Sequence, residues 1–328
     1  MRTLTRRRGF LSHGRPGWVP ASAARFRYTY GLGGASVLLF LLLLVTGLPL
    51  LFQYQPGDGA YRSLANLTYV LPYGWLFRSL HFWAAQMLVV TVLFHLLRVA
   101  LTRAFLPPRR FNWWLGVGLL VLVVGLDYTG YLLRGDLEAV SAATVGWSIL
   151  RSVPVVGQAL AALIFGSGGQ GALLGLSAWH SSVFPLAGFG VMGWHLWHVR
   201  RDGGISRPAA DDGTHIPLSQ LAAREWVAGL AVANLVLLLA LLLPPGLGLA
   251  PDQPSVAPVP APWVFGAVQV LLHRLSPFVA GVAVPLAAVL LLGSAPYLEE
   301  RRPWLGRTLV LAVATCFTAL TLYFWWQV

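Results

Sequence analysis

Seven long apolar segments constrain the fold of this chain more than any other feature of its sequence. They lie at approximately residues 31–53, 76–101, 112–133, 179–199, 224–244, 276–296 and 306–327. A helix needs about 20 apolar residues to cross the hydrocarbon region of a bilayer, and each segment reaches that length. Only 10% of the residues are charged, and the mean hydropathy is +0.68. The sequence therefore predicts an all-α integral membrane protein with seven transmembrane helices.

The basic residues predict how these helices are oriented. All 23 are arginines, and 18 of them lie in or beside the N-terminal arm and the connections that follow the second, fourth and sixth segments. The other five fall on the opposite side: Arg62, Arg78, Arg134, Arg151 and Arg274. Because cytoplasmic loops carry the arginine excess, we expect a cytoplasmic N-terminus and a C-terminus on the outer side. The net charge of +12 is thus an orientation signal, and no nucleic-acid partner is expected.

The connections divide the chain into four regions. Residues 1–30 are expected to form a cytoplasmic N-terminal arm, and residues 31–201 contain the first four segments. The long outer connection within that region, at about 134–178, predicts one or two short amphipathic helices. Residues 202–223 have the composition of a cytoplasmic linker, and residues 224–328 contain the last three segments. We therefore expect a four-helix bundle followed by a three-helix part.

Two of the apolar segments carry two histidines each. His81 and His95 are fourteen residues apart, and His180 and His195 are fifteen residues apart. At 1.5 Å per residue these intervals correspond to about 21 Å and about 22.5 Å along the helix axes. Both segments are predicted to run from the outside to the inside, so His81 lies level with His180, and His95 with His195. Each pair can bind one haem iron axially between helices of a bundle.

These histidines could have two roles other than haem binding. Zinc is disfavoured because the two pairs lie too far apart to share one ion. Packing histidines are the other alternative, but ionisable rings are costly inside a membrane and usually serve a function there. Four of them at matching depths on two helices therefore favour two haem sites.

Glycines repeat the same interval on two other segments. Gly33 and Gly47 lie in the first segment, and Gly116 and Gly130 lie in the third, with a separation of fourteen residues in each case. Glycine lets a flat group approach a helix backbone closely, which favours clearance for a porphyrin, although small residues also serve helix packing in membranes. The single cysteine, Cys316, is not part of a haem-attachment motif, so both haems are expected to be non-covalent.

Several runs carry a family resemblance that extends from about Val19 to the end of the chain. The runs are RSLHFWAAQMLVVTVLFHLLRVALTRAF, GVGLLVLVVGLDYTGYLL, SAWHSSVFPLAGFGVMGWHLWHVRRDGGISRP and SAPYLEERRP. They resemble the cytochrome b of quinol-oxidising cytochrome bc complexes. The closest match is the arrangement of cytochrome b6 followed by subunit IV, here fused in one polypeptide. The resemblance implies that His81 and His180 hold an outer, low-potential haem b, while His95 and His195 hold an inner, high-potential one.

The resemblance also implies roles for three arginines and a set of partners. Arg78 and Arg98 match arginines that meet haem propionates, and Arg200 matches a basic residue of the inner quinone site. The family oxidises a quinol at an outer site and sends one electron to a Rieske iron–sulfur protein and then to a c-type cytochrome. The other electron crosses through both haems to an inner quinone. A homodimeric complex in a bacterial cytoplasmic membrane, supplied by its quinone pool, is the expected setting.

The chain departs from the family pattern at the outer quinol site. The family has a PEWY motif there, whose glutamate is thought to accept a proton, but this chain reads Pro-Ala-Pro-Trp, with Ala261 and Trp263 in the second and fourth positions. The Pro-Trp expected after the third segment is replaced by a run that contains Arg134 and Asp136. Gly31 stands where the chloroplast type has a cysteine, so its additional covalent haem is not expected.

The missing glutamate leaves the proton acceptor and the overall function open. Alanine cannot take a proton, so Asp127, Asp136 and Glu138 become the candidates by location. A carboxylate inside a membrane span is costly, which favours Asp127, although it could also cap a helix or pair with Arg134.

Two functions follow from these observations. The first is the di-haem subunit of a bc-type quinol:cytochrome c oxidoreductase, which is an enzyme only in assembly. The second is a non-bifurcating electron conduit from the quinone pool to an outer-side oxidoreductase or multihaem cytochrome. A haem-free transporter or scaffold would require the histidine pattern to be accidental.

Overall fold

A computed structural model describes residues 17–166, 171–206, 213–254 and 259–327. Six of its helices are long and apolar enough to cross a membrane. They are α3 (Leu32–Gln53), α5 (Gly74–Leu101), α6 (Arg110–Leu132), α11 (Leu218–Leu242), the π-turn η2 (Val279–Ala283) continued by α13 (Val284–Arg301), and α14 (Leu305–Gln327). The prediction of an all-α fold is confirmed, apart from one short two-stranded ribbon.

The remaining predicted span, 179–199, is helical but less apolar than the other six. It begins in the π-turn η1 (Trp179–Val183) and continues as α10 (Phe184–Arg201), and α9 (Gly171–Ala178) leads directly into it. Histidines, glycines and two terminal arginines lower its hydropathy, so it is not among the six helices that qualify by length and composition. The count of seven crossings therefore depends on α10.

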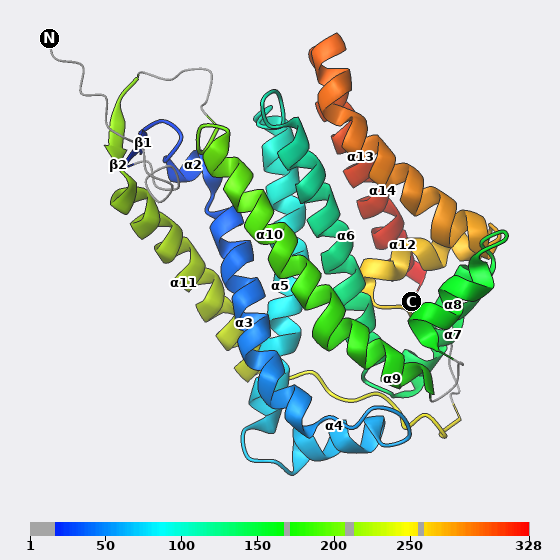
Figure 1. Cartoon of the computed structure of the whole chain (residues 1–328). Coiled ribbons are helices and arrows are strands. Elements are labelled where there is room, and N and C mark those ends of the chain that lie inside the picture. Colours follow the sequence, from blue (N-terminus) through cyan, green and yellow to red (C-terminus); the bar gives the residue numbers. More distant parts are fainter. Residues whose placement is uncertain (1–16, 167–170, 207–212, 255–258, 328) are drawn as a thin grey trace, which may run out of the picture.

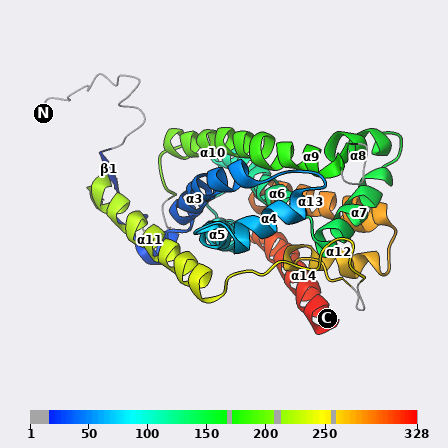
Figure 2. The same ribbon diagram turned by 90° about the horizontal axis from the view of Figure 1, so that it is seen from below.

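Four helices, α3, α5, α6 and α10, form a bundle, and the C-terminal helices α11, α13 and α14 lie on two of its sides (Figure 1). In this bundle α3 packs against α5, α10 packs against α6, and α5 contacts α6. Viewed along the bundle, α11 lies beside α3 and α5, while α13 and α14 lie on the other side of α6 and α5 (Figure 2). The largest core cluster joins these parts, because Ala84 and Val89 of α5 pack with Val123 of α6 and Val236 of α11.

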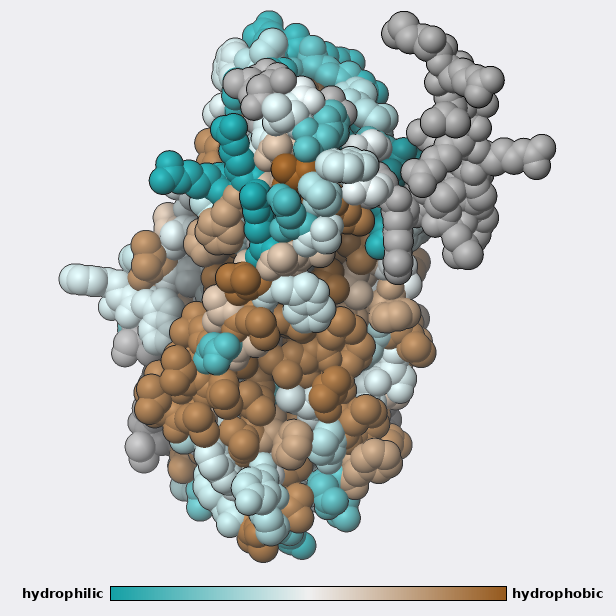
Figure 3. All heavy atoms as spheres, turned by 90° about the vertical axis from the view of Figure 1, so that its left-hand side faces the viewer, coloured by the Kyte–Doolittle hydropathy of each residue, from teal (hydrophilic) through white to brown (hydrophobic). Residues whose placement is uncertain are grey.

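The surface has the polarity expected of a membrane-spanning bundle. Figure 3 shows a broad hydrophobic band across the middle of one face of the molecule, between two more hydrophilic ends. Many large apolar side chains are exposed on the outward faces of the helices, among them Phe52, Leu186, Trp226 and Leu242. Exposed apolar surface on this scale is unfavourable in water and favourable in lipid.

Four short helices cover the end of the bundle that lies away from the N-terminal strand (Figure 1). They are α4 (Ala60–Tyr69), α7 (Leu137–Arg151), α8 (Gly157–Phe165) and α12 (Trp263–Leu272). The prediction of short helices between residues 134 and 178 agrees with α7 and α8, whereas α4 and α12 were not predicted. Asp136 caps α7 by accepting a hydrogen bond from the Ala139 backbone N–H.

The N-terminal arm and the linker at 202–223 meet at the other end. Strand β1 (Trp18–Pro20) pairs antiparallel with β2 (His215–Pro217), so Val19 lies opposite Ile216. Val19, Ala24 and Leu221 form a small buried cluster beside this ribbon, near the short helix α2 (Phe26–Thr29). Residues 1–16 of the predicted arm lie outside the described residues, and the four-region division stays a prediction.

A buried carboxylate fastens the C-terminal helices at the same end as the ribbon. Glu299 of α13 is fully buried. Its Oε2 accepts a hydrogen bond from the Arg307 backbone N–H at 3.2 Å, and its Oε1 forms an ion pair with Arg103 Nε at 3.2 Å. We expect Glu299→Ala to lower the stability of the folded chain by about 1–3 kcal/mol, because it leaves these donors unpaired. Thermal unfolding in detergent measures the loss. Glu300→Ala, which removes a more exposed ion pair with Arg110, is the control and should cost under about 1 kcal/mol. Equal losses in the two variants would contradict the role given to Glu299.

Candidate functional site

The rings of His81 and His180 lie at the spacing of an axial ligand pair. His81 projects from α5 and His180 from the π-turn η1, and their ring centroids are 6.2 Å apart with planes inclined by 71°. Imidazole nitrogens bind zinc or iron at about 2 Å, so two rings that bind one iron from opposite sides have centres about 6 Å apart. No group of three or more His, Cys, Asp or Glu side chains among the described residues is arranged for a metal ion. The geometry therefore fits haem, which needs only two protein ligands, better than zinc.

Two threonines fix the tautomers of this outer pair. Thr46 and Thr129 each donate their single hydroxyl hydrogen to a backbone carbonyl of their own helix, at 2.8 Å. The same hydroxyls lie 3.0 Å from His81 Nδ1 and 3.1 Å from His180 Nδ1, where they are left to act as acceptors. Both Nδ1 atoms therefore carry the ring hydrogen, and both Nε2 lone pairs remain available to a metal.

The inner histidines differ from each other in this respect. His195 Nδ1 lies 3.2 Å from the Asn112 backbone oxygen, which can only accept, so its Nε2 is likewise the free nitrogen. His95 Nδ1 is buried and has no hydrogen-bond partner among the described residues. Sequence reasoning missed the threonines, although each directly precedes one of the predicted glycines, as the dipeptides Thr46-Gly47 and Thr129-Gly130.

Each predicted glycine faces one of the four histidines. If Cβ atoms were added to these glycines, they would lie within 2.7–3.5 Å of a ring Cε1: Gly130 against His180, Gly33 against His95, Gly47 against His81, and Gly116 against His195. The glycines were predicted to give clearance to a porphyrin. In the structure an imidazole lies next to each glycine, so the missing side chains make room for the histidines, and the clearance for a porphyrin stays a prediction.

A π-turn accounts for the unequal histidine intervals. The interval is fourteen residues on α5 and fifteen on the helix that carries His180 and His195. The π-turn η1 covers residues 179–183, immediately around His180, and a π-turn takes up one residue more than an α-turn. The additional residue is therefore absorbed without changing the depth of His180, and the two pairs stay level.

The two arginines predicted to meet haem propionates have different surroundings. Arg98 donates through Nε to the Tyr28 backbone oxygen at 2.7 Å, and one terminal nitrogen, NH2, is buried without a partner among the described residues. An orphaned guanidinium nitrogen three residues from His95 fits an absent carboxylate. Arg78 instead donates to the backbone oxygens of Pro245 at 2.5 Å and Gly246 at 2.8 Å, so it holds the α11–α12 loop. The propionate role of Arg78 stays a prediction for its remaining N–H groups.

Arg134 and Asp136 hold the same loop from the other side. Asp136 is fully buried, forms an ion pair with Arg134, and accepts from the Gly248 backbone N–H at 3.1 Å. Its other oxygen caps α7, and Arg134 also pairs with Glu138 at 3.0 Å. Because both oxygens of Asp136 are already engaged, the structure favours a structural role for it over proton transfer.

Asp127 belongs to a different group of contacts, centred on Gln86. Trp263 Nε1 donates to Gln86 Oε1 at 2.6 Å, and Gln86 Nε2 lies 3.2 Å from Asp127 Oδ1. These three residues come from α12, α5 and α6. Ala261 also lies close by in sequence, and its backbone N–H donates to Gln269 Oε1 at 2.6 Å. Gln86 and Gln269 were not predicted, since a lone glutamine has no recognisable spacing.

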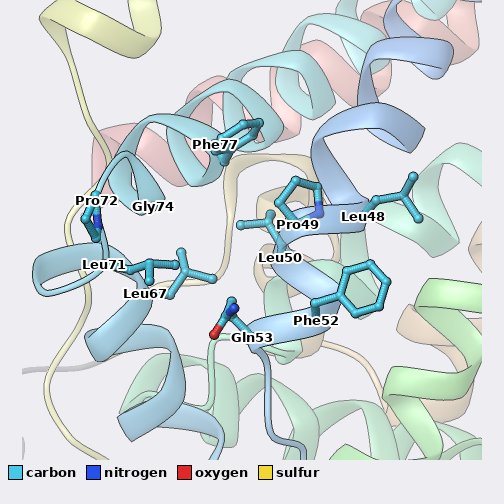
Figure 4. Close-up of a pocket in the computed structure, with 10 residues that line it drawn as sticks. All are labelled: Leu48, Pro49, Leu50, Phe52, Gln53, Leu67, Leu71, Pro72, Gly74 and Phe77. Carbon is cyan, nitrogen blue, oxygen red and sulfur yellow. The ribbon is translucent and has the colours of Figure 1, made fainter.

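Two further features lie apart from these contacts. Arg200, predicted for the inner quinone site, is exposed near the C-terminal end of α10. A cavity of about 400 Å³ opens between the end of α3, α4 and the start of α5 (Figure 4). Its walls include Phe52, Leu67 and Phe77, and Gln53 is the only polar side chain among them. The cavity can accept an apolar chain but offers no group for proton transfer, and none of the predicted site residues lines it.

The threonine contacts lead to a prediction about redox potential. Thr129→Val removes the acceptor of His180 Nδ1–H and should make that ligand less electron-donating, which disfavours the ferric state. We expect the midpoint potential of the outer haem to rise by tens of millivolts, on the scale that hydrogen bonds to ligands produce. Potentiometric titration of the haem absorbance measures the shift. Thr144→Val, at an exposed position of α7, is the control; an unshifted outer haem in Thr129→Val would refute the tautomer assignment.

Comparisons with known proteins agree with this geometry. A family model described as cytochrome b (N-terminal)/b6/petB matches residues 86–261. Cytochrome b6 of Synechococcus sp. (strain JA-3-3Ab) is 37% identical over 182 residues, which cover 55% of this chain and 84% of that protein. The menaquinol:cytochrome c reductase cytochrome b subunit of Geobacillus thermodenitrificans is 33% identical over 185 residues, which cover 55% of this chain and 82% of that subunit.

A solved structure extends the similarity of fold to the C-terminal helices. A chain described as hyperthermophilic respiratory Complex III superposes with a TM-score of 0.71, at 19% identity, and the match covers 90% of each chain. At that identity the match supports the fold alone. Taken with the family model, whose match includes His95, His180 and His195, and with these relatives, it leads to one conclusion: this integral membrane chain belongs to the cytochrome b/b6 family of cytochrome bc complexes.

Proposed function

We propose that the chain is the di-haem b subunit of a quinol:cytochrome c oxidoreductase of the bc type. The observation that carries the proposal is the outer pair, His81 and His180. The spacing and tautomers of their rings fit two nitrogen ligands of one haem iron. Family membership implies b-type haem and interaction with quinone. The second pair, His95 and His195, supports a second haem because each of these rings also faces a glycine.

In this proposal the bound haems supply one-electron transfer, and the protein positions them. The four histidines would hold the haems at two depths of the bundle, since His81 and His95 are about 21 Å apart along the axis of α5. Arg98 offers a buried donor to a carboxylate of the inner haem. A cluster of apolar side chains, which includes Leu88 and Val89 of α5, lies between the two sites.

The path of the electrons follows from the predicted orientation. With α10 as the seventh crossing, the pair His81–His180 lies near the outer surface and His95–His195 near the cytoplasm. The strand β1 and the end of α14 lie towards opposite ends of the bundle, which supports an odd number of crossings (Figure 1). Quinol oxidation is then placed near Trp263 and Asp127, and quinone reduction near Arg200, with a Rieske protein and a c-type cytochrome as outer partners in a homodimeric complex.

A second candidate function keeps the haems but omits electron bifurcation. Ala261 favours it, because the family's glutamate is absent there. The chain would then connect the quinone pool to an outer-side oxidoreductase or multihaem cytochrome. The complete arrangement of α11 to α14, including the helix that brings Trp263 to Gln86, favours the first candidate.

Quinol-dependent reduction of the haems in the purified complex tests the proposal. With the inner site inhibited, decylubiquinol or menadiol should reduce haem b, and the co-purified partners should include a Rieske protein. A complex whose haems quinol does not reduce, or which contains a multihaem subunit and no Rieske protein, would contradict it. Absence of a reduced-minus-oxidised b-type spectrum would contradict both candidates.

A further inference from the structure

Gln86 has a fixed orientation that determines how it meets Asp127. The indole nitrogen of Trp263 can only donate, so the Gln86 atom 2.6 Å away from it must be the amide oxygen. The amide nitrogen therefore points to Asp127 and donates to its Oδ1 at 3.2 Å. In this arrangement Oδ1 accepts the hydrogen bond from Gln86, which favours Oδ2 as the oxygen that takes up a proton. Among the described residues, no hydrogen-bond partner is found for Oδ2.

On its helix Asp127 lies one turn from the residue that meets the outer histidine pair. It precedes Gly130 by three residues on α6, so it lies within about 60° of the helix face that meets His180. Gln86 follows His81 by five residues on α5, about 7.5 Å further along the axis. A carboxylate at this depth of a membrane-spanning helix is expensive unless it has a function.

In the described part of the chain, the other polar groups on α6 and α7 at this end already have partners, among them Glu138, which pairs with Arg134. The tyrosines of α6 on either side are already donors: Tyr128 donates to the Ala142 backbone oxygen and Tyr131 to Glu138. The titratable groups of the neighbouring helices closest to this depth are His81 and His180, whose rings face each other with their centroids 6.2 Å apart. Helix α12 contributes no titratable side chain. At position 261 the backbone N–H is taken by Gln269, and the side chain is a methyl group.

We propose that Asp127 accepts a proton from the quinol at the outer site, with Gln86 and Trp263 as positioning residues. This inference rests on the proposed function, and it assigns the role that the family's missing glutamate leaves open. In the step, one hydroquinone O–H bond breaks, its proton binds Asp127 Oδ2, and the electron pair of that bond stays on the hydroquinone oxygen. The anion formed in this way is the species that is then oxidised.

The hydrogen bonds explain why three helices are needed for this role. Gln86 stabilises the carboxylate form of Asp127 while Trp263 prevents the amide from turning over and presenting its oxygen to the acid. The contact also couples the proton acceptor to the start of α12, whose position depends on the loop held by Arg78 and Asp136. Asp127 is therefore tied to the same loop that the family uses at this site.

The experiment measures quinol-driven haem reduction in the purified complex, with decylubiquinol and menadiol as the probes. Asp127→Asn keeps the shape of the side chain and should slow reduction by about 100-fold or more, within the range contributed by general bases. The wild-type rate should rise with pH as the acceptor ionises, and Asp127→Asn should lose that rise. Asp127→Glu should restore both the rate, to within about tenfold of the wild type, and the pH dependence.

Two further variants test the positioning residues and the specificity of the effect. Gln86→Met removes both hydrogen bonds at similar volume and should move the ionisation seen in the pH profile, which a purely structural role would leave in place. Asp252→Asn makes the same chemical change at an exposed carboxylate of the α11–α12 loop and should behave as the wild type. Dithionite reduction of each variant confirms that the haem content is intact.

The outcomes separate this inference from the proposed function. A fully haem-loaded Asp127→Asn variant with the wild-type rate and pH profile overturns the role of Asp127 alone. A wild-type complex without haem, or one that quinol does not reduce, overturns the proposed function and this inference with it.

Discussion

Replacement of His180 by leucine is expected to leave the chain with one haem instead of two. His180 shares the outer site with His81 at a centroid separation of 6.2 Å, and leucine fills the space without offering a nitrogen. A single remaining imidazole holds a haem far less firmly than an axial pair. The inner pair, His95 and His195, lies on the same helices about 21 Å further along them, and it should keep its haem. Haem per chain, measured as the pyridine haemochrome, should therefore fall by half, and electron transfer from quinol should be lost.

A neighbouring histidine supplies the control for this experiment. His198 is on the same helix as His180 and His195, but its ring packs against Phe111 and Trp197 at 4.9 Å and faces no glycine of the four. His198→Gln should retain both haems. If His180→Leu also retains two haems, or if both are lost while the chain stays folded, the assignment of separate outer and inner pairs is wrong.

Substitution of Gly130 by alanine is expected to disturb the outer haem almost as severely. A Cβ at this position would lie 2.7 Å from His180 Cε1, closer than real Cβ contacts allow, so the ring must move. Because the hydrogen bond from Nδ1 to Thr129 sets the ring orientation, the displaced ring loses this contact or its alignment with His81. We expect loss or marked weakening of the outer haem, seen as lower haem content and an altered spectrum, although alanine is the better helix former.

The other glycines predict a graded series. Cβ atoms at Gly33 and Gly47 would lie 3.2 and 3.3 Å from a histidine ring, and at Gly116 the distance is 3.5 Å, an ordinary contact. Damage by alanine should therefore decrease from Gly130 to Gly116. Gly118→Ala is the control on the same helix, because nothing lies within 4 Å of its Cβ position. An equal effect at all five positions would indicate that the helices, and not the rings, are disturbed.

The histidine and glycine intervals allowed much of the site to be predicted from sequence. A long apolar helix has a fixed rise, so residues fourteen apart on α5 lie at two depths whatever their neighbours are. The glycines on α3 and α6 carry the same interval, and the structure places each of them against a histidine. The pairing of His81 with His180 required only that two helices run in the same direction.

Other contacts of the site could not be predicted because they depend on chain folding between distant segments. Arg78 makes hydrogen bonds with backbone oxygens 167 and 168 residues further along the chain, which were not predicted. Backbone groups of a loop carry no sequence signal that identifies their partner. The same is true of Gln86, whose hydrogen bond with Trp263 joins α5 to a helix that is 177 residues further along the chain at that contact.

The local geometry of the His180 helix was also beyond sequence reasoning. The fifteen-residue interval can be read from the sequence. The π-turn that compensates for it is a backbone arrangement, and no residue type in Trp179–Val183 predicts it. Helix α12 was missed for a similar reason. It is ten residues long, too short to resemble a span, and it follows a proline-rich stretch that is typical of a loop.

A redox titration of the purified wild-type chain, combined with haem quantification, tests the central claim most directly. We expect two b-type haems per chain that titrate as two one-electron steps, and that are both extracted by acidified organic solvent because neither is covalently attached. One haem per chain, none, or a haem that remains on the extracted polypeptide would contradict this claim.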